Sequence, residues 1–169
     1  KIGMKGEMRK SQNGKQFQLP RRLDHFLITT LERGEDNNFV RDEEIHGIDS
    51  IGPTPVSLPV RLLYDDPALN FPTRLTCYRG MKLWCHGDGE TAQRLTGTTR
   101  QAVSCPCEKN DPLYEGNDKC KHTGVLSVVL ENAPIVGGVW KFRTTGFNSV
   151  RNIMSSLELI VRLTGGILA

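Results

Sequence analysis

Four cysteines stand in or beside a strongly polar stretch of the chain, and this arrangement most constrains what it can fold into. Cys105 and Cys107 flank a single proline, and twelve residues, EKNDPLYEGNDK, separate Cys107 from Cys120. A loop this polar has too few apolar side chains to hold itself in place. A metal ion with soft thiolate ligands supplies the missing anchor, so we expect a structural zinc site between Cys85 and Cys120.

The sequence leaves two candidates for the fourth ligand of this site. Cys105, Cys107 and Cys120 are combined either with Cys85, which precedes a glycine-rich turn, or with His122. The fifth cysteine, Cys77, lies within an apolar strand and is expected to be a small core residue. The odd number of cysteines and the lack of a visible secretory leader argue against a disulfide scaffold, and free thiols are the alternative to a metal.

The turn after Cys85 also allows an enzymatic interpretation. His86, Asp88 and Glu90 are residue types that bind a catalytic metal or transfer protons in a metallohydrolase. Ordinary turn formation explains Asp88 and Glu90 equally well, and a site rich in cysteine fits a closed, structural metal better. The chain has no phosphate-binding glycine loop, no nucleophile elbow and no zinc-protease helix motif. We therefore expect no enzyme and no catalytic residue.

Composition places the chain among globular proteins, and its charge is unevenly distributed. Of its 169 residues, 37% are hydrophobic and 24% charged, and the net charge is +3. Basic residues dominate 1–22 and 138–163, whereas 32–49 are acidic. No apolar run is long enough to span a membrane, so a cytoplasmic protein is expected. Since the first residue is Lys and the last ones are apolar, we interpret the chain as a fragment.

The spacing of apolar and turn residues predicts a β-rich fold with one helix. Strands are expected at residues 1–10, 16–19, 24–30, 56–63, 74–85, 125–130 and 139–145, with turns at Asn13-Gly14 and Arg79-Gly80. An apolar stripe predicts an amphipathic helix at 148–164, capped by Asn148 or Ser149 and ended by Gly165. We expect a single α+β domain, 1–169. It is a mostly antiparallel sheet or partly open, OB-like barrel with an inserted zinc lobe at 85–122 and this C-terminal helix.

The chain resembles a family of phages and integrative mobile elements described as recombination directionality factor-like. The resemblance covers most of the chain and is clearest from Arg74 to Leu163. It rests on the HGDGE turn and the run PCPCEKNDPLYEGNDKCKHTGVLSVVLENAPIVGGVWKFRTTGFNSVRNIMSSLELI. It implies a cysteine cluster at Cys85, Cys105, Cys107 and Cys120. It also implies a non-enzymatic accessory protein of the bacterial host cell that binds DNA and a partner such as a large serine integrase, which relatives switch from integration to excision.

Basic residues beside aromatic ones predict where nucleic acid would bind. Lys141 and Arg143 alternate with Trp140 and Phe142 on one strand, and the hairpin before Cys85 adds Arg74 and Lys82. Cations that follow phosphates and aromatics that stack on bases are typical of proteins that bind single strands. If Trp140 and Phe142 are core residues, only the cations face outward. A single-stranded DNA-binding protein and a virion or assembly component are the alternatives to a recombination accessory.

Overall fold

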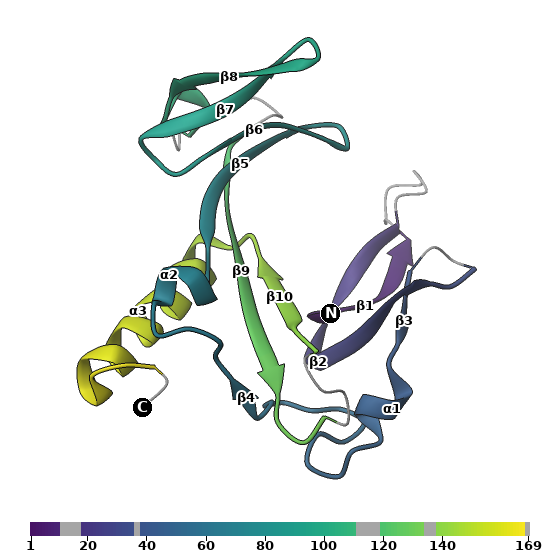
Figure 1. The fold of residues 1–169 in the computed structure, drawn as a ribbon. Helices are drawn as coiled ribbons and strands as arrows, with labels where there is room; N and C mark the ends of the chain where they lie inside the picture. Colours follow the sequence, from purple (N-terminus) through teal and green to yellow (C-terminus); the bar gives the residue numbers. More distant parts are fainter. Residues whose placement is uncertain (11–17, 36–37, 111–118, 134–137, 168–169) are drawn as a thin grey trace. The chain divides into compact units, whose positions relative to one another are not determined.

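The computed structural model describes residues 1–10, 18–35, 38–110, 119–133 and 138–167, in which β-strands predominate (Figure 1). The strands are β1 (Ile2–Lys10), β2 (Gln18–Arg33), β3 (Phe39–Arg41), β4 (Val60–Arg61), β5 (Thr73–Arg79), β6 (Lys82–Gly87), β7 (Thr91–Thr96), β8 (Thr99–Ser104), β9 (Lys121–Leu130) and β10 (Trp140–Thr144). The helices are α1 (Glu43–His46), α2 (Pro67–Asn70), the 3₁₀ turn η1 (Glu108–Asn110) and α3 (Phe147–Thr164).

These strands form one open, mostly antiparallel sheet. Its order is β3-β2-β1-β10-β9-β5-β6-β7-β8, with β4 paired to β9. The pairing of β1 with β10 is parallel, whereas β5 through β8 pair with one another in antiparallel fashion. The predicted α+β class, the antiparallel sheet and the C-terminal helix are confirmed. Because the path ends at β3 and at β8, the described strands form an open sheet and not the alternative OB-like barrel.

The chain divides into two compact units. Unit 1 contains residues 1–63 and 127–142, and unit 2 contains residues 64–126 and 143–169. Both β9 and β10 continue from one unit into the other, so this division does not test the prediction of a single domain. The predicted turn at Asn13-Gly14 lies outside the described residues.

Unit 1 contains the N-terminal strands and a short helix in the acidic segment. The strand predicted at 16–19 was expected to end at Pro20, but β2 continues through this proline to Arg33. Residues 32–55 were predicted to form a loop with one short helical turn; α1 agrees with this turn, and β3 is an added strand. Asp42 begins α1 by accepting a hydrogen bond from the N–H of Ile45 at 3.2 Å. Ile28 and Ile45 are completely buried in this unit.

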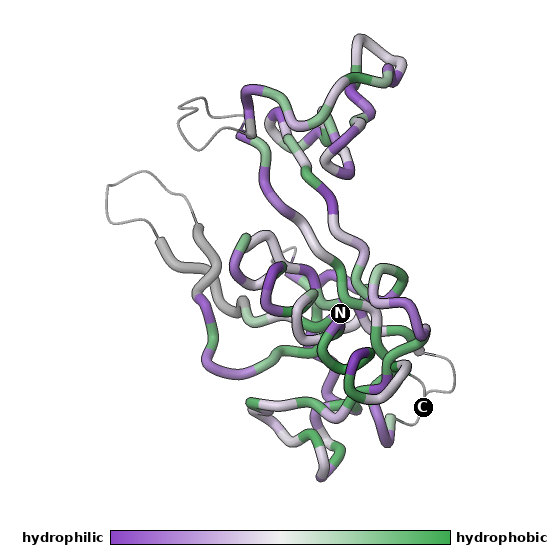
Figure 2. Tube along the Cα trace, turned by 90° about the vertical axis from the view of Figure 1, so that its left-hand side faces the viewer, coloured by the Kyte–Doolittle hydropathy of each residue, from purple (hydrophilic) through white to green (hydrophobic). Residues whose placement is uncertain are grey.

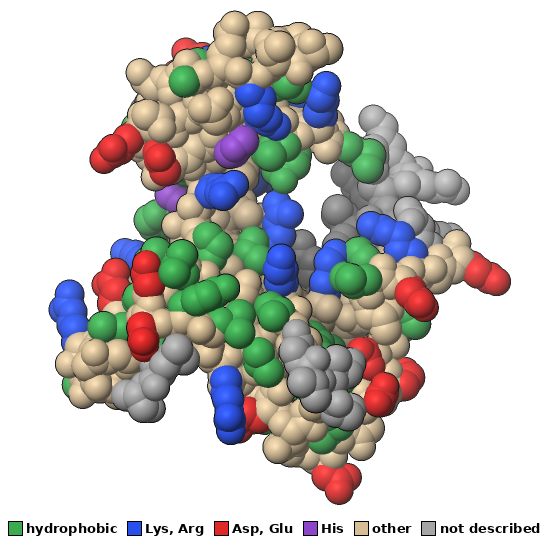
Figure 3. Space-filling model, viewed as in Figure 1, with side chains coloured by type: hydrophobic (Ala, Val, Ile, Leu, Met, Phe, Trp, Pro, Cys, Tyr) green, Lys and Arg blue, Asp and Glu red, His purple; other side chains and the backbone are tan. Residues whose placement is uncertain are grey.

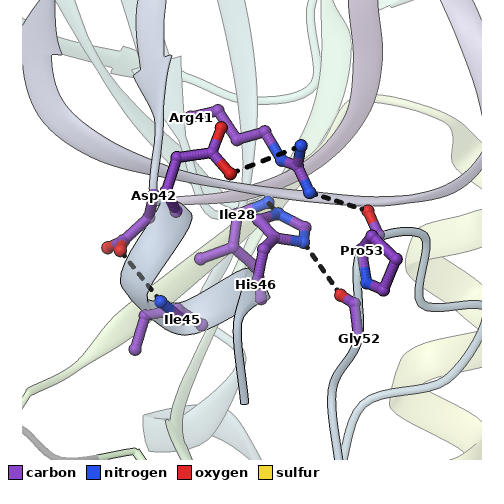
Figure 4. Close-up of polar contacts among 8 residues, drawn as sticks. Ile28, Arg41, Asp42, Ile45, His46, Gly52 and Pro53 are labelled. Carbon is purple, nitrogen blue, oxygen red and sulfur yellow. Dashed lines mark hydrogen bonds and ion pairs between the residues drawn. The ribbon is translucent and has the colours of Figure 1, made fainter. Parts of the chain in front are cut away.

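A buried histidine ties α1 to the strand β2 and to the loop that follows the helix (Figure 4). The N–H of Ile28 donates to Nε2 of His46 at 3.0 Å, and Nδ1 of His46 lies 3.1 Å from the carbonyl oxygen of Gly52. Arg41 adds a second link to the same loop by donating to the carbonyl of Pro53 at 3.0 Å. These side-chain bonds satisfy backbone groups that lack a partner in the sheet.

The alternation predicted for β10 is confirmed. Trp140 is buried, and the ring of Phe142 packs edge-on against Phe26 with centroids 6.1 Å apart. Lys141 and Arg143 are exposed on the other side of the strand. Trp140 is thus buried and Phe142 half-buried, whereas the cations of β10 are exposed.

Unit 2 contains two successive hairpins, of which the sequence predicted one. The expected hairpin is β5–β6, and its two-residue turn has Gly80 at φ +59°. The second, β7–β8, lies within the segment expected to be looped, and Gly97 at φ +64° starts its turn. A positive φ at the first turn position is tolerated best by glycine. In the described parts of this stretch, residues 85–110 and 119–122, the chain forms strands and the turn η1 rather than an extended loop, and no zinc lobe is apparent there.

Helix α3 packs its predicted apolar stripe through Val150 and Leu157, which are buried. It begins after Gly146, which makes no side-chain cap, so the expected cap at Asn148 or Ser149 is wrong. Gly165 ends the helix as expected, in the left-handed conformation at φ +77°, with its N–H bonded to the carbonyl of Val161.

Hydrophobic and hydrophilic positions alternate along the trace in Figure 2. Within the described residues, no helix has both the length and the apolar character needed to cross a membrane.

Candidate functional site

The cysteines of unit 2 gather around the β5–β6 hairpin. Cys77 and Cys85 are cross-strand partners, and both are buried. Cys105 and Cys120 pack against them from the ends of β8 and β9, although these four residues come from distant parts of the sequence. The fifth, Cys107, comes after the cis peptide bond between Cys105 and Pro106. Like Cys85, it interacts with the guanidinium of Arg94.

The turn after Cys85 is shaped to bring Cys105 close. A β-carbon added at Gly87 would lie 3.0 Å from the sulfur of Cys105 and 2.5 Å from the carbonyl oxygen of Thr91. Only glycine leaves room for this approach. The backbone N–H of Gly89 donates to the Cys105 thiol, and the N–H of Cys105 donates to the carbonyl of Glu90 at 2.9 Å. The glycine-rich turn therefore holds Cys105 by shape and by hydrogen bonds.

Arg94 brings a positive charge to the sulfurs. It lies on β7 directly opposite Cys85 and is partly buried. Burial lowers the pKa of Arg94, but hydrogen bonds and charge from Cys85 and Cys107 outweigh this effect, and the net pKa is raised. Its Nε is a buried donor without a hydrogen-bond partner. A guanidinium beside thiols favours their ionised form, which is the form that binds metals.

Two of the thiols are hard to ionise as they stand. Burial raises the pKa of Cys120 to about 12, and the neighbouring Cys77, Cys107 and Cys85 add to this effect. Burial also raises the pKa of Cys105, with Cys107 and Cys85 contributing. Thiolates crowded in one place repel one another, and a divalent cation is the group that relieves such repulsion. The chemistry of the donors thus fits a thiophilic metal.

The thiols are gathered but not arranged as a coordination shell. Among the side chains that the structure describes, no three of His, Cys, Asp and Glu are spaced as ligands of one metal ion. The zinc site at Cys85, Cys105, Cys107 and Cys120 therefore stays a prediction. His122, the alternative ligand, packs against Phe147 of α3 with ring centroids 5.0 Å apart.

Of the residues in the enzymatic interpretation, Asp88 stabilises the turn and His86 contacts Arg100. Oδ1 of Asp88 accepts hydrogen bonds from the backbone N–H groups of Glu90 and Thr91, both at 2.8 Å. These hydrogen bonds lower the pKa of Asp88. Nδ1 of His86 lies 3.2 Å from the guanidinium of Arg100. Partial burial and the positive charges of Arg100 and Arg74 lower the pKa of His86. The plain structural role of Asp88 is thus sufficient to explain its presence.

The residues predicted to contact nucleic acid lie in both units. Arg74 and Lys82 are exposed on β5 and β6, and Arg143 donates to the hydroxyl of Tyr78 at 3.1 Å. These belong to unit 2, whereas Lys141 belongs to unit 1. Arg143 therefore contacts β5 through Tyr78, and Lys141 lies two residues before it on the same strand, β10.

Two residues around the cysteines, Trp84 and Arg94, were not predicted as part of the site. Trp84 packs against the cluster, and Arg94 lies over its ring. Arg94 was missed because β7 was not predicted. Gly97 at the turn is a sequence feature consistent with a hairpin, but no local pattern gives the register that places Arg94 opposite Cys85.

Comparison with known proteins gives one family. A search of curated proteins and a search of solved structures each give no match. The model of the Gp3-like family, described as recombination directionality factor-like, matches residues 1–169. This confirms the resemblance found in the sequence, which covers most of the chain, and extends it to residues 1–169. The chain therefore belongs to the Gp3-like, recombination directionality factor-like family.

Proposed function

We propose that this chain is an accessory protein of site-specific recombination that turns a serine integrase from integration toward excision. The match of the whole chain to a recombination directionality factor-like family carries the proposal. Such a role requires contacts with the recombinase and with DNA, and it requires no catalytic step by the accessory itself. The protein would act in the cytoplasm of the bacterial host, where its DNA substrate lies.

A reconstituted reaction tests this role. The integrase encoded beside the gene is incubated with the two DNA sites that integration joins, or with the two hybrid sites that integration produces, with and without the purified chain. We expect the chain to raise recombination between the hybrid sites, which is excision, and to lower recombination between the original sites, which is integration. If the yields of both reactions stay unchanged at saturating protein, the chain does not set the direction of that integrase.

We further propose a structural zinc ion held by Cys85, Cys105, Cys107 and Cys120. The proposal is supported by the packing of Cys85, Cys105 and Cys120, by the N–H of Gly89 donated to Cys105 and by the cation of Arg94. Zinc with four thiolates has no open position, so it contributes folding energy and no chemistry. It would fasten the segment after β8 and the start of β9 to β6.

Zinc content tests the ligand set. Purified protein should contain one zinc ion per chain, measured by plasma mass spectrometry. Cys107→Ser should remove most of it, because three thiolates hold zinc less tightly than four. Cys77→Ala is the matched control and should retain the metal, since Cys77 is a core residue in this proposal. Full zinc in Cys107→Ser, or loss of zinc in Cys77→Ala alone, would refute the assignment.

A further inference from the structure

Cations surround the indole ring of Trp84. The register of β5 and β6 passes from Cys77↔Cys85 to Tyr78↔Leu83, so Trp84 is the extra residue of a β-bulge. The guanidinium carbon of Arg79 lies 3.9 Å from the ring centroid, and the ammonium nitrogen of Lys109 lies 5.6 Å from it. Arg94 lies 4.8 Å away. Side chains from β5, β7 and η1 thus meet at one aromatic ring.

The cysteine cluster supports this ring from beneath. Trp84 packs against the buried group formed by Cys77, Cys85 and Ala92. Arg94 is engaged by the sulfurs of Cys85 and Cys107, so its charge is directed inward. Arg79, by contrast, is exposed and lies over the ring. The scaffold therefore holds an outward-facing cation at a fixed place, which lowers the entropy lost when an anion binds.

The tip of the β5–β6 hairpin continues this surface. Arg79 and Lys82 are cross-strand partners on either side of the turn, and both are exposed. Between them Met81 projects with 102% relative exposure. From residue 73 to residue 109 the sequence has six Lys and Arg residues against three Asp and Glu residues. Lys and Arg side chains gather on this part of unit 2 in Figure 3.

We propose that the Trp84 surface, defined as Arg79, Met81, Lys82, Trp84 and Lys109, binds the sugar–phosphate backbone of duplex DNA. Guanidinium and ammonium groups donate charge-assisted hydrogen bonds to phosphate oxygens. An exposed methionine at a hairpin tip suits contact with the floor of a groove between the two phosphate rows. Stacking of a base on Trp84, as single-strand binders require, would have to displace Arg79 from the ring. This inference rests on the DNA contact in the proposed function and names the surface that makes it.

Binding to a labelled duplex of random sequence tests the surface. Fluorescence anisotropy is measured with the full chain over a series of salt concentrations. Arg79→Gln combined with Lys82→Gln should weaken binding by about tenfold and reduce the salt slope by about two, because two phosphate contacts are lost. The matched control, Arg151→Gln combined with Arg162→Gln, removes the same charge from exposed positions of α3 and should bind as the unaltered chain does.

Three results would overturn the inference. The first is unchanged affinity of the Arg79 and Lys82 double variant, and the second is an equal loss in the α3 control. The third is that the unaltered chain does not bind duplex DNA. If the Arg79 and Lys82 double variant then also loses binding to the integrase, the partner of this surface is an acidic protein surface. The outcomes are distinguishable from failure of the proposed function. A chain that binds DNA through Arg79 and Lys82 but leaves integrase direction unchanged supports this surface and rejects the accessory role.

Discussion

His46 uses both ring nitrogens for backbone hydrogen bonds inside unit 1. Its side chain is 4% exposed, and it accepts from the N–H of Ile28 and contacts the carbonyl of Gly52. These two bonds fix the neutral tautomer with the proton on Nδ1. The histidine thus replaces a missing strand partner.

Removal of this imidazole should destabilise the protein. His46→Ala leaves the buried N–H of Ile28 without an acceptor, which costs about 1–3 kcal/mol. We expect a lower midpoint of urea unfolding, measured by circular dichroism. His25→Ala is the control, because the ring of His25 contacts the exposed carboxylate of its neighbour Asp24 at 2.7 Å and no buried backbone group depends on that contact. Equal midpoints for the two variants would show that the His46 bonds do not contribute to stability.

At the scale of single elements, β9 and the start of β5 meet through a glycine. Gly124 lies opposite Thr73, and a β-carbon there would overlap the ring of Phe71, which is completely buried. The close approach of backbone to ring therefore depends on the absence of a side chain. This contact anchors the part of β9 that belongs to unit 2.

Gly124→Ala should consequently loosen the packing of β9. The added methyl group has no space, and overpacking of this kind costs about 1–3 kcal/mol. Urea unfolding followed by tryptophan fluorescence should show an earlier midpoint. Gly3→Ala serves as the control, since nothing lies within 4 Å of the β-carbon it would add. A midpoint for Gly124→Ala at or above that of the control contradicts the described packing.

Elements that bury a regular stripe could be predicted from the sequence, and elements that do not were missed. The stripe of α3 reflects real burial of Val150 and Leu157, and β10 alternates as its pattern indicates. In β8 every residue except Val103 is exposed, so no period-2 apolar signal exists. The start of α3 was misplaced because Gly146 caps it by backbone conformation alone.

The ligand set of the candidate site stays a prediction, and the surroundings of the cysteines could not be foreseen from the sequence. The polar sequence between the cysteines indicated that they gather at one site. The fold packs Cys105 and Cys120 against the buried cluster that contains Cys85. The contribution of Arg94 depends on the β7 register opposite Cys85, which no local pattern encodes. Cys77 was assigned to the core, where it is buried. Its free thiol also forms a hydrogen bond with the thiol of Cys120.

At the scale of the whole molecule, the topology depends on contacts between distant parts of the chain. Ile2 pairs in parallel with Phe142, and Val60 pairs with Leu130. Such pairings carry no signature in a single sequence, because each strand alone fits several partners. The family match, in contrast, covers residues 1–169 and thus includes both units. The proposed function therefore belongs to the complete chain rather than to the cysteine cluster alone.

The most direct test is the ratio of excised to integrated product as the chain is titrated into its integrase. We predict that this ratio rises with the unaltered chain and with Cys77→Ala, and that Cys107→Ser, with its zinc lost, raises it less. A ratio that stays constant over the whole titration of the unaltered chain would contradict the account.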